Sequence, residues 1–409
     1  MKFTEFNFDP RLQEGIEASN YEEATPVQEQ VIPLILQGKD IIASAQTGTG
    51  KTAAFLLPLV HKILTEKHDA DDIISLIIVP TRELAIQIQD HLEGLSYFTS
   101  ISSIAVYGGN DGHAFLQEKK ALNSGADIVV CTPGKMLYHI KTGNVKLSKL
   151  KYLVLDEADR MLDMGFSDDI MFIIKNLPQK RQNLLFSATM PPKIRTMAKT
   201  ILTDPAEITL AVNKPAEKIV QEAYIVYETQ KIPLVLNLLE QKKNVMVLIF
   251  CSSKISVKQL TKELKRKGIN ADEIHSDLEQ DKREQIIMQY KSGRLPVLVA
   301  TDILSRGIDF DNIDLVINFD VPHDSEDYVH RIGRTARAAS EGSAYTLVSE
   351  QEQGKFQRIE KFLGKEITKV DVSAIVGEQP AYDPKPAFNP NKKKKPFKKG
   401  NFKRGAKKE

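Results

Sequence analysis

Residues 43–52 read ASAQTGTGKT and stand between a short apolar run that ends at Ile42 and a helical pattern that begins at Ala53. A loop of small residues between a strand and a helix leaves backbone N–H groups free to bind one anion, and the helix dipole strengthens that attraction. Lys51 supplies a charge for the outer phosphates and the Thr52 hydroxyl a ligand for Mg²⁺. Ala45 stands where the usual pattern starts with glycine. The stretch predicts a phosphate-binding loop (P-loop) formed by Ala45, Gln46, Thr47, Gly48, Thr49, Gly50, Lys51 and Thr52.

Short apolar runs alternate with helical patterns along the whole chain, which is typical of parallel sheets covered by helices. The strand candidates are 40–44, 73–80, 103–107, 127–132, 152–156, 183–186, 223–227, 245–251, 271–275, 296–300, 315–318 and 344–348. Prolines and polar residues interrupt the alternation at 204–218. We therefore expect two α/β domains at 1–208 and 219–368, a linker at 209–218 and a tail at 369–409. The second half has no phosphate loop at 251–254, because CSSK contains no glycine, so one nucleotide site must serve both domains.

The composition is that of a soluble globular protein, with 42% hydrophobic and 27% charged residues. No apolar run approaches the roughly 18 residues of a membrane span, and the N-terminus lacks the apolar core of a signal peptide. We expect a cytoplasmic protein. Cys131 and Cys251 lie inside separate apolar runs, which predicts two buried thiols and neither a disulfide nor a metal site.

The net charge of +2 hides an asymmetry between the body of the chain and its end. Residues 377–409 carry 11 basic and 3 acidic residues, which is +8 and leaves −6 for the rest. Few aliphatic residues occur there, so we expect disorder. This tail can be an inert solvated end, a nuclear localisation run, or a tether that holds RNA through lysines and through Phe388, Phe397 and Phe402.

The apolar run YLVL at 152–155 ends in the acidic tetrapeptide 156–159. An acid at the end of a strand is where P-loop enzymes hold Mg²⁺, and Asp156 fits that role. Glu157, one residue further, can activate water as a general base. An acidic helix N-cap is the alternative for the tetrapeptide alone, and the P-loop upstream argues against it.

The tetrapeptide spells DEAD, and the chain resembles the DEAD-box RNA helicases of superfamily 2 over nearly all of residues 3–349. The matching motifs are TPVQ at 25–28, the P-loop, PTREL at 80–84, GG at 108–109, TPGK at 132–135, SAT at 187–189, IFCSS at 249–253, QDKR at 280–283, ATD at 300–302, RGID at 306–309 and YVHRIGRTAR at 328–337. The resemblance implies two RecA-like domains joined by a short linker, and a bacterial-type, ATP- and Mg²⁺-dependent RNA helicase that acts as a monomer.

The resemblance also assigns roles to residues around the nucleotide. A glutamine amide can donate to and accept from an adenine edge at once, so Gln28 is the adenine selector, with Tyr21 stacking on the base. Asp309 is expected to accept from the ribose hydroxyls. Arg334 and Arg337 are expected to reach the γ-phosphate as arginine fingers from the second domain.

Within the same motif, His330 and Arg331 are expected to tie the arginine-rich segment to the DEAD and SAT motifs. For RNA, short loops rich in Thr, Gly and Arg can hold phosphates closely without reading bases. The candidate RNA contacts are Thr81, Arg82, Gly109, Thr132, Gly134, Thr301 and Asp302.

Four positions depart from the family pattern. Asn20 replaces a glycine and tolerates a left-handed backbone; Lys135 replaces an arginine and is expected to weaken one RNA contact. Ala336 replaces a glycine, and the segment at 249–253 matches only loosely. Two rival functions stay open, namely a DNA-directed helicase and an ATP-gated RNA clamp with little unwinding. The choice of RNA over DNA depends on recognition of the 2′-hydroxyl and comes here only from the resemblance.

Overall fold

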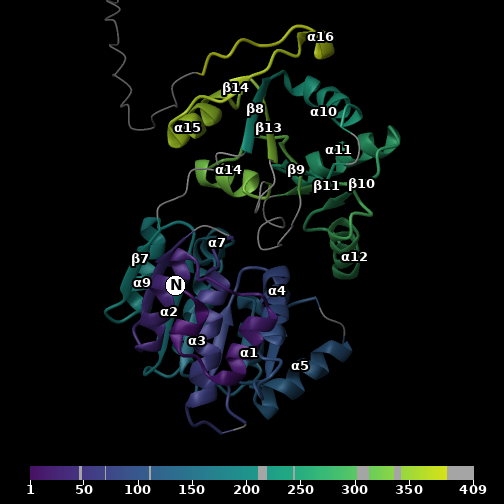
Figure 1. The fold of residues 1–409 in the computed structure, drawn as a ribbon. Coiled ribbons are helices and arrows are strands. Elements are labelled where there is room, and N and C mark those ends of the chain that lie inside the picture. The colour runs from purple at the N-terminus through teal and green to yellow at the C-terminus, as the bar shows by residue number, and fades with distance from the viewer. Residues whose placement is uncertain are drawn as a thin grey trace, which may run out of the picture.

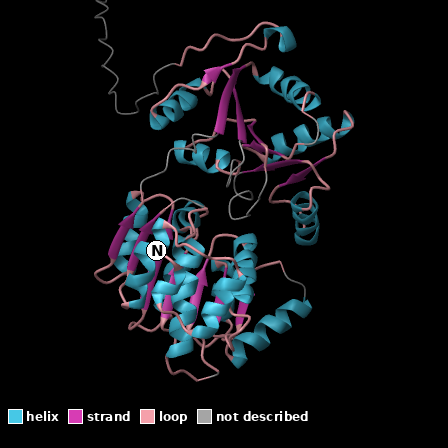
Figure 2. Cartoon of the chain, in the orientation of Figure 1, coloured by secondary structure: helices cyan, strands magenta, loops and turns pink. Residues whose placement is uncertain are grey.

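The computed structural model contains two α/β domains, and each is a parallel sheet with helices on both faces (Figure 1, Figure 2). The structure describes residues 1–45, 48–69, 71–109, 112–210, 219–242, 245–301, 313–335 and 342–384, and the side chains of 112–114 are not included. Within these ranges no helix is long and apolar enough to span a bilayer.

The first sheet has seven strands in the order β3-β4-β2-β5-β6-β1-β7. Its strands are β1 Ile41–Ser44, β2 Ser75–Ile78, β3 Ser103–Val106, β4 Ile128–Cys131, β5 Tyr152–Leu155, β6 Gln182–Ser187 and β7 Ala206–Thr209. Its helices are η1 Phe3–Phe6, α1 Pro10–Ala18, α2 Pro26–Leu36, α3 Lys51–Thr65, α4 Arg82–Leu95, α5 Gly112–Ser124, α6 Pro133–Lys141, α7 Ala158–Asp163, α8 Ser167–Lys175 and α9 Pro192–Ile201. The strands β2, β4, β5 and β6 are buried along their whole length, as expected for a sheet covered on both faces.

The second sheet also has seven strands, in the order β10-β11-β9-β12-β13-β8-β14. Its strands are β8 Ile219–Ile225, β9 Val247–Cys251, β10 Ala271–Ile274, β11 Val297–Thr301, β12 Leu315–Asn318, β13 Gly342–Val348 and β14 Thr368–Lys369. Its helices are η2 Glu228–Gln230, α10 Lys231–Glu240, α11 Lys254–Arg266, α12 Gln280–Lys291, α14 Ser325–Ile332, α15 Gln353–Leu363 and α16 Ser373–Val376.

The two sheets have the same topology, because each strand of the second takes the place of the strand seven earlier in the first. The strand that corresponds to β1, which leads into the P-loop, is therefore β8. A second phosphate loop would lie after β8 and not after β9. The lack of glycine at 251–254 therefore does not bear on whether the second domain has such a loop. The corresponding segment runs from the end of β8 to the start of α10.

All twelve predicted strands are confirmed, and two short strands were missed. β7 lies at 206–209, inside the stretch taken for an interdomain break, and β14 at 368–369. Both are edge strands, and in β7 only Ile208 is buried. Such a strand has no continuous apolar run to reveal it in the sequence.

The predicted boundary of the tail at 369 is wrong for residues 369–384. β14 pairs with β8 up to Lys369, and the segment that follows lies along the second domain. Gln379 donates to the Ile225 carbonyl (2.8 Å), and the Tyr382 hydroxyl donates to Glu360 (2.7 Å). The polar composition of this segment hid its packing, because it is held by hydrogen bonds to buried partners and has few apolar residues of its own.

Candidate active site

The P-loop lies between β1 and α3, where the sequence predicts it. Gly48 and Gly50 have φ values of +81° and +90°, in the left-handed region that favours glycine. A Cβ on Gly50 would also lie 2.5 Å from the amide nitrogen of Gln28. The Lys51 ammonium is buried and donates to the Ala45 carbonyl (2.7 Å), so the charge lies within the loop. Gln46 and Thr47 lie outside the described residues.

Gln28 belongs to the same site through the P-loop itself. Its amide oxygen accepts from the Thr25 N–H (2.8 Å), which forms a capping box at the start of α2, and its nitrogen donates to the Gly50 carbonyl (3.1 Å). One lone pair and one amide hydrogen stay unused by these bonds. Tyr21 packs against Phe3 with ring centroids 5.5 Å apart, and burial raises the pKa of its hydroxyl. Asn20 has a φ of +57°, so its left-handed backbone is confirmed.

Asp156 and Glu157 follow β5 at the carboxyl edge of the sheet. Burial raises the pKa of Asp156 to about 6, with the nearby Lys51 charge opposing and the Glu157 charge adding to the rise. Glu157 has a φ of +50°, a left-handed backbone that is uncommon for a residue with a side chain. Its carboxylate lies 3.4 Å from Nη1 of Arg160, a buried partner that sequence motifs did not predict. The negative charge of the buried Asp156 carboxylate is only partly offset by Lys51, so a divalent cation would be bound favourably there.

The DEAD and SAT segments are hydrogen-bonded to each other. The second carboxylate oxygen of Asp159 accepts from the N–H (2.9 Å) and the hydroxyl (2.8 Å) of Thr189. The Asp159 N–H donates to the Ser187 hydroxyl (3.2 Å), and the Ser187 carbonyl accepts from the Ala45 N–H (3.1 Å). The P-loop, the acidic segment and the SAT segment therefore form one connected unit.

The candidate RNA contacts of the first domain gather at one edge. They follow β2, β3 and β4, which are neighbours in the sheet. The Thr81 hydroxyl caps α4 by accepting from the Leu84 N–H (3.3 Å). Thr132 precedes α6 and makes no capping bond through its side chain. Around Gly134, which is exposed, a Cβ would meet nothing within 4 Å, so backbone can be approached closely there.

Arg82 connects this edge to the second domain. Its guanidinium covers Gly109, where a Cβ would lie 2.1 Å from Nη1. The same Nη1 donates to Gln280 on α12 (3.1 Å). Beside it, Nη1 of Arg283 lies 2.9 Å from Glu83, and both side chains are less than a tenth exposed. The QDKR segment, which had a family match but no assigned role, is thus an interdomain contact, with α12 facing the start of α4 (Figure 1).

The arginine-rich segment begins on α14. Arg331 donates to the Asn318 side chain (3.1 Å) and to the Asp320 carbonyl (2.8 Å), both in its own domain. These two bonds hold Arg331 within the second domain, and its expected link to the DEAD and SAT motifs stays a prediction. Arg334 is buried in the turn after α14. Arg337, Asp309 and Asp302 lie outside the described residues, and Thr301 ends β11.

Lys135, which was expected to weaken one RNA contact, has its observed partners within the first domain. Its ammonium lies 2.9 Å from Glu118, a carboxylate only 2% exposed, and 5.1 Å from the Phe115 ring centroid. Burial alone would raise the pKa of Glu118, but His139 and Lys135 outweigh it and lower the pKa. Lys135 therefore joins α5 to α6, and its partner is a residue that sequence motifs do not mark.

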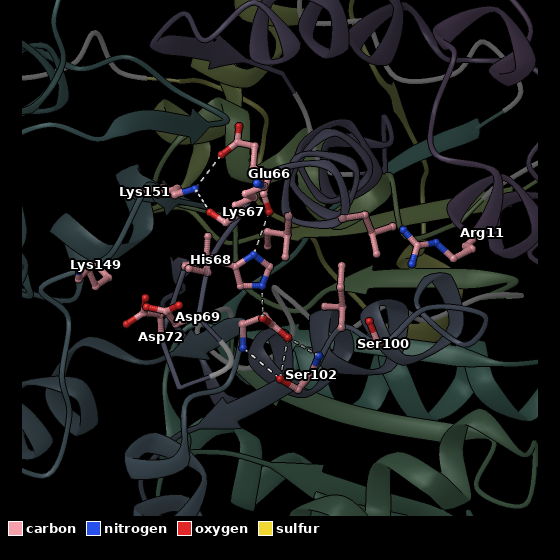
Figure 3. A pocket seen from close by; sticks show the side chains of 15 residues that line it. Arg11, Glu66, Lys67, His68, Asp69, Asp72, Ser100, Ser102, Lys149 and Lys151 are labelled. Carbon is pink, nitrogen blue, oxygen red and sulfur yellow. Dashed lines mark hydrogen bonds and ion pairs between the residues drawn. The ribbon is translucent and has the colours of Figure 1, made fainter.

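A cavity of about 880 Å³ lies at the opposite, amino-terminal edge of the first sheet. Its lining includes His68, which lies 3.0 Å from Asp127, and Lys151 (Figure 3). None of the predicted site residues lines it. In the described ranges no three His, Cys, Asp or Glu side chains could together hold a metal ion. Both cysteines are buried, as predicted, and neither is part of a disulfide.

Comparisons with known proteins agree with this geometry. Residues 25–197 match the DEAD/DEAH box helicase family and residues 230–339 the helicase conserved C-terminal domain. The ATP-dependent RNA helicase CshA of Listeria monocytogenes is 43% identical over 361 residues, covering 88% of this chain and 68% of that protein. Mss116p bound to ssRNA and AMP-PNP has a TM-score of 0.80 at 29% identity, covering 92% of this chain and 82% of that chain.

Two solved structures of a second relative, in different complexes, match the structure of this chain to different extents. S. cerevisiae Dbp5 bound to RNA and ADP BeF3 gives a TM-score of 0.82, at 31% identity and with 90% of this chain and 95% of that chain covered. A Dbp5 variant bound to Nup159, Gle1, IP6 and ADP gives 0.62, with 90% and 97% covered at 30% identity. The coverage and the identity are nearly equal in the two comparisons, so neither accounts for the difference in TM-score.

Proposed function

We infer the function of this chain from its family, because it belongs to the DEAD-box ATP-dependent RNA helicases. Membership makes it an RNA-stimulated ATPase and helicase of two RecA-like domains. The finer proposal is that ATP and single-stranded RNA draw the domains together, that the closed form clamps RNA and opens a short duplex, and that hydrolysis releases it.

The observation that carries this proposal is the buried interdomain contact between α12 and the start of α4. Arg283 and Glu83 meet there, beside Arg82, at the edge where the candidate RNA loops gather. The higher TM-score to the RNA-bound form of Dbp5 supports the same arrangement of the domains. RNA bound across this edge would touch both domains and so favour closure.

The chain's own groups suit in-line hydrolysis of a nucleoside triphosphate. Lys51 holds the outer phosphates, Glu157 orients and deprotonates the attacking water, and Arg334, with Arg337, brings charge from the second domain. Thr52 and Asp156 would hold Mg²⁺, which supplies charge compensation on the phosphates. Gln28 reads the adenine edge with its unused donor and acceptor.

We place the enzyme in the cytoplasm of a bacterium, because CshA of Listeria monocytogenes is a bacterial RNA helicase. We take a monomer as the acting unit because both halves of the site lie on one chain. The test is strand separation of a short RNA duplex with ATP in excess. Repeated separation coupled to hydrolysis supports the helicase; stable binding with ATP and no separation supports the clamp. Arg334→Ala should keep ATP binding and lose separation, because the arginine contributes only after closure.

A further inference from the structure

Lys231 occupies, in the second domain, the position that the P-loop lysine has in the first. β8 lies between β13 and β14, as β1 lies between β6 and β7. The first α-helix after β1 begins at Lys51, and the first α-helix after β8 begins at Lys231. Two equivalent strands therefore lead to two buried lysines at the starts of equivalent helices.

The surroundings of the two ammonium groups differ. Lys231 has no exposed surface and lies 3.0 Å from Asp320, 2.9 Å from Glu352 and 3.0 Å from Glu228. Its ammonium also lies 5.3 Å from the Phe319 ring centroid. Burial would lower the pKa of Lys231, and the carboxylates outweigh it and raise the pKa. Protein carboxylates thus stand around Lys231 where phosphates are expected around Lys51.

Asp320 connects this lysine to two functional segments. Its second oxygen accepts from the N–H (2.7 Å) and the hydroxyl (2.8 Å) of Ser252, the first residue after β9. β9 pairs with β11 so that Cys251 lies opposite Thr301, a candidate RNA contact. The Asp320 carbonyl accepts from Arg331, on the helix that leads to Arg334.

Glu352 bonds to the same lysine and to the residue that follows Asp320, but in these contacts it does not reach the loop after β9. Its oxygens accept from the Val321 N–H (3.0 Å) and the Ser349 hydroxyl (2.7 Å). Glu228 also bonds to Lys231, but its side chain is 66% exposed. One cation therefore has three carboxylate partners, and among these contacts the side chain of Asp320 alone reaches the loop after β9.

We propose that Lys231 and Asp320 form an internal counterpart of the nucleotide site, with a protein carboxylate in the place of a phosphate, and that Asp320 is a positioning residue for RNA-stimulated hydrolysis. Its side chain holds the loop next to Thr301, and its carbonyl holds the helix that leads to Arg334, without a nucleotide in this domain. The inference rests on the proposed function, because it takes Thr301 as an RNA contact and Arg334 as a finger.

The experiment compares Asp320→Asn and Glu352→Gln in the full chain. Each change removes one carboxylate charge from Lys231, so both should lower the melting temperature to a similar extent. Asp320→Asn should in addition reduce kcat at saturating RNA by about tenfold and leave the affinity for an ATP analogue within about twofold, because analogue binding uses the first domain. Glu352→Gln and the exposed control Glu228→Gln should keep kcat within about twofold.

A second variant covers the case in which Asp320→Asn does not fold. Ser252→Ala removes only the hydroxyl donor and should reduce kcat about threefold with an unchanged melting temperature. Equal losses of kcat in Asp320→Asn and Glu352→Gln, or an unchanged kcat in Ser252→Ala, would reduce the cluster to a structural ion network and overturn the inference. A wild-type chain without RNA stimulation would instead remove the proposed function and this inference with it.

Discussion

Glu157 combines burial, a left-handed backbone and a cationic neighbour in one residue. Residues held in sparsely populated backbone regions cost about 1–3 kcal/mol and persist where the surrounding structure fixes them, often at active sites. Here the preceding Asp156 accepts from the Glu157 N–H (2.9 Å), and Arg160 lies at the carboxylate. The carboxylate is thereby aimed at one position, as a general base requires.

Glu157→Gln should keep ATP and RNA binding and lose turnover, because the amide preserves shape and cannot take a proton. Loss of a general base costs about 10²–10⁴ in rate. Steady-state ATP hydrolysis with saturating RNA measures it, with analogue binding as the control for folding. Hydrolysis within about threefold of wild type would remove Glu157 from the role of base.

Gly134 offers a test of the RNA edge with a matched control. Gly134 and Gly94 are both exposed helical glycines at which a Cβ would meet nothing within 4 Å. Replacing either by alanine should stabilise the fold by up to about 0.5–1 kcal/mol, because glycine weakens a helix. Only Gly134→Ala should weaken RNA binding, since the methyl would lie where a strand approaches the backbone.

Chemical denaturation of the two glycine variants gives their free energies of unfolding, and RNA titration gives their affinities for RNA. Equal RNA affinity in Gly134→Ala and Gly94→Ala would place the strand elsewhere.

The residue types of the site were predictable from sequence, and their partners only in part. The P-loop, Asp156, Glu157 and Gln28 could be named from sequence, because their chemistry depends on local sequence around a strand end, and their roles stay predictions. The observed partners of Lys135 and Arg331 were not predicted.

The reason is that a motif identifies a cation but not the carboxylate or carbonyl that it meets in space. Glu118 and Asp320 come from other elements and have no sequence signature.

At the scale of elements, the contact between α12 and α4 links the two sheets. Arg283 and Glu83 are nearly buried, and breaking such a pair usually costs about 3–5 kcal/mol because one charge is left without compensation. Arg283→Glu alone should therefore weaken domain closure and raise the RNA concentration needed for half-maximal ATPase.

The exchanged double variant, Glu83→Arg with Arg283→Glu, restores the opposite charges and should recover much of the loss. RNA titration of ATPase in the three variants gives a double-mutant cycle. Additive effects, with no recovery in the double variant, would mean that the two side chains do not meet in the active form.

The order of the elements was predictable because buried parallel strands are continuous apolar runs. β7 and β14 escaped prediction because an edge strand buries few of its side chains. The correspondence between β1 and β8 could not be predicted from sequence, because it depends on the order of the strands in the sheet and not on their order in the chain.

At the scale of the whole molecule, charge is divided between the packed body and the end of the chain. Residues 385–409 carry 11 basic residues and 1 acidic residue, a net +10 against −8 for 1–384. Residues 377–384 pack on the second domain. The truncated protein that tests the tail should therefore keep residues 1–384 and lack only 385–409.

Removal of residues 385–409 should weaken RNA binding to a similar extent for unrelated RNA sequences, because lysines contact phosphates and not bases. The slope of log affinity against log salt should become shallower by about 0.7 for each RNA phosphate that the tail would otherwise neutralise. An equal slope with and without the tail would leave it an inert end.

The proposed function requires that one ATP site, completed by both domains, responds to RNA. ATP hydrolysis by the full chain, measured with no nucleic acid, with single-stranded RNA and with DNA of the same sequence, tests this most directly. We expect RNA to stimulate hydrolysis at least about tenfold, since an arginine finger alone contributes about 10³–10⁵ in enzymes that use one. We expect little stimulation by DNA. Equal stimulation by DNA, or a rate that RNA leaves unchanged, would contradict it.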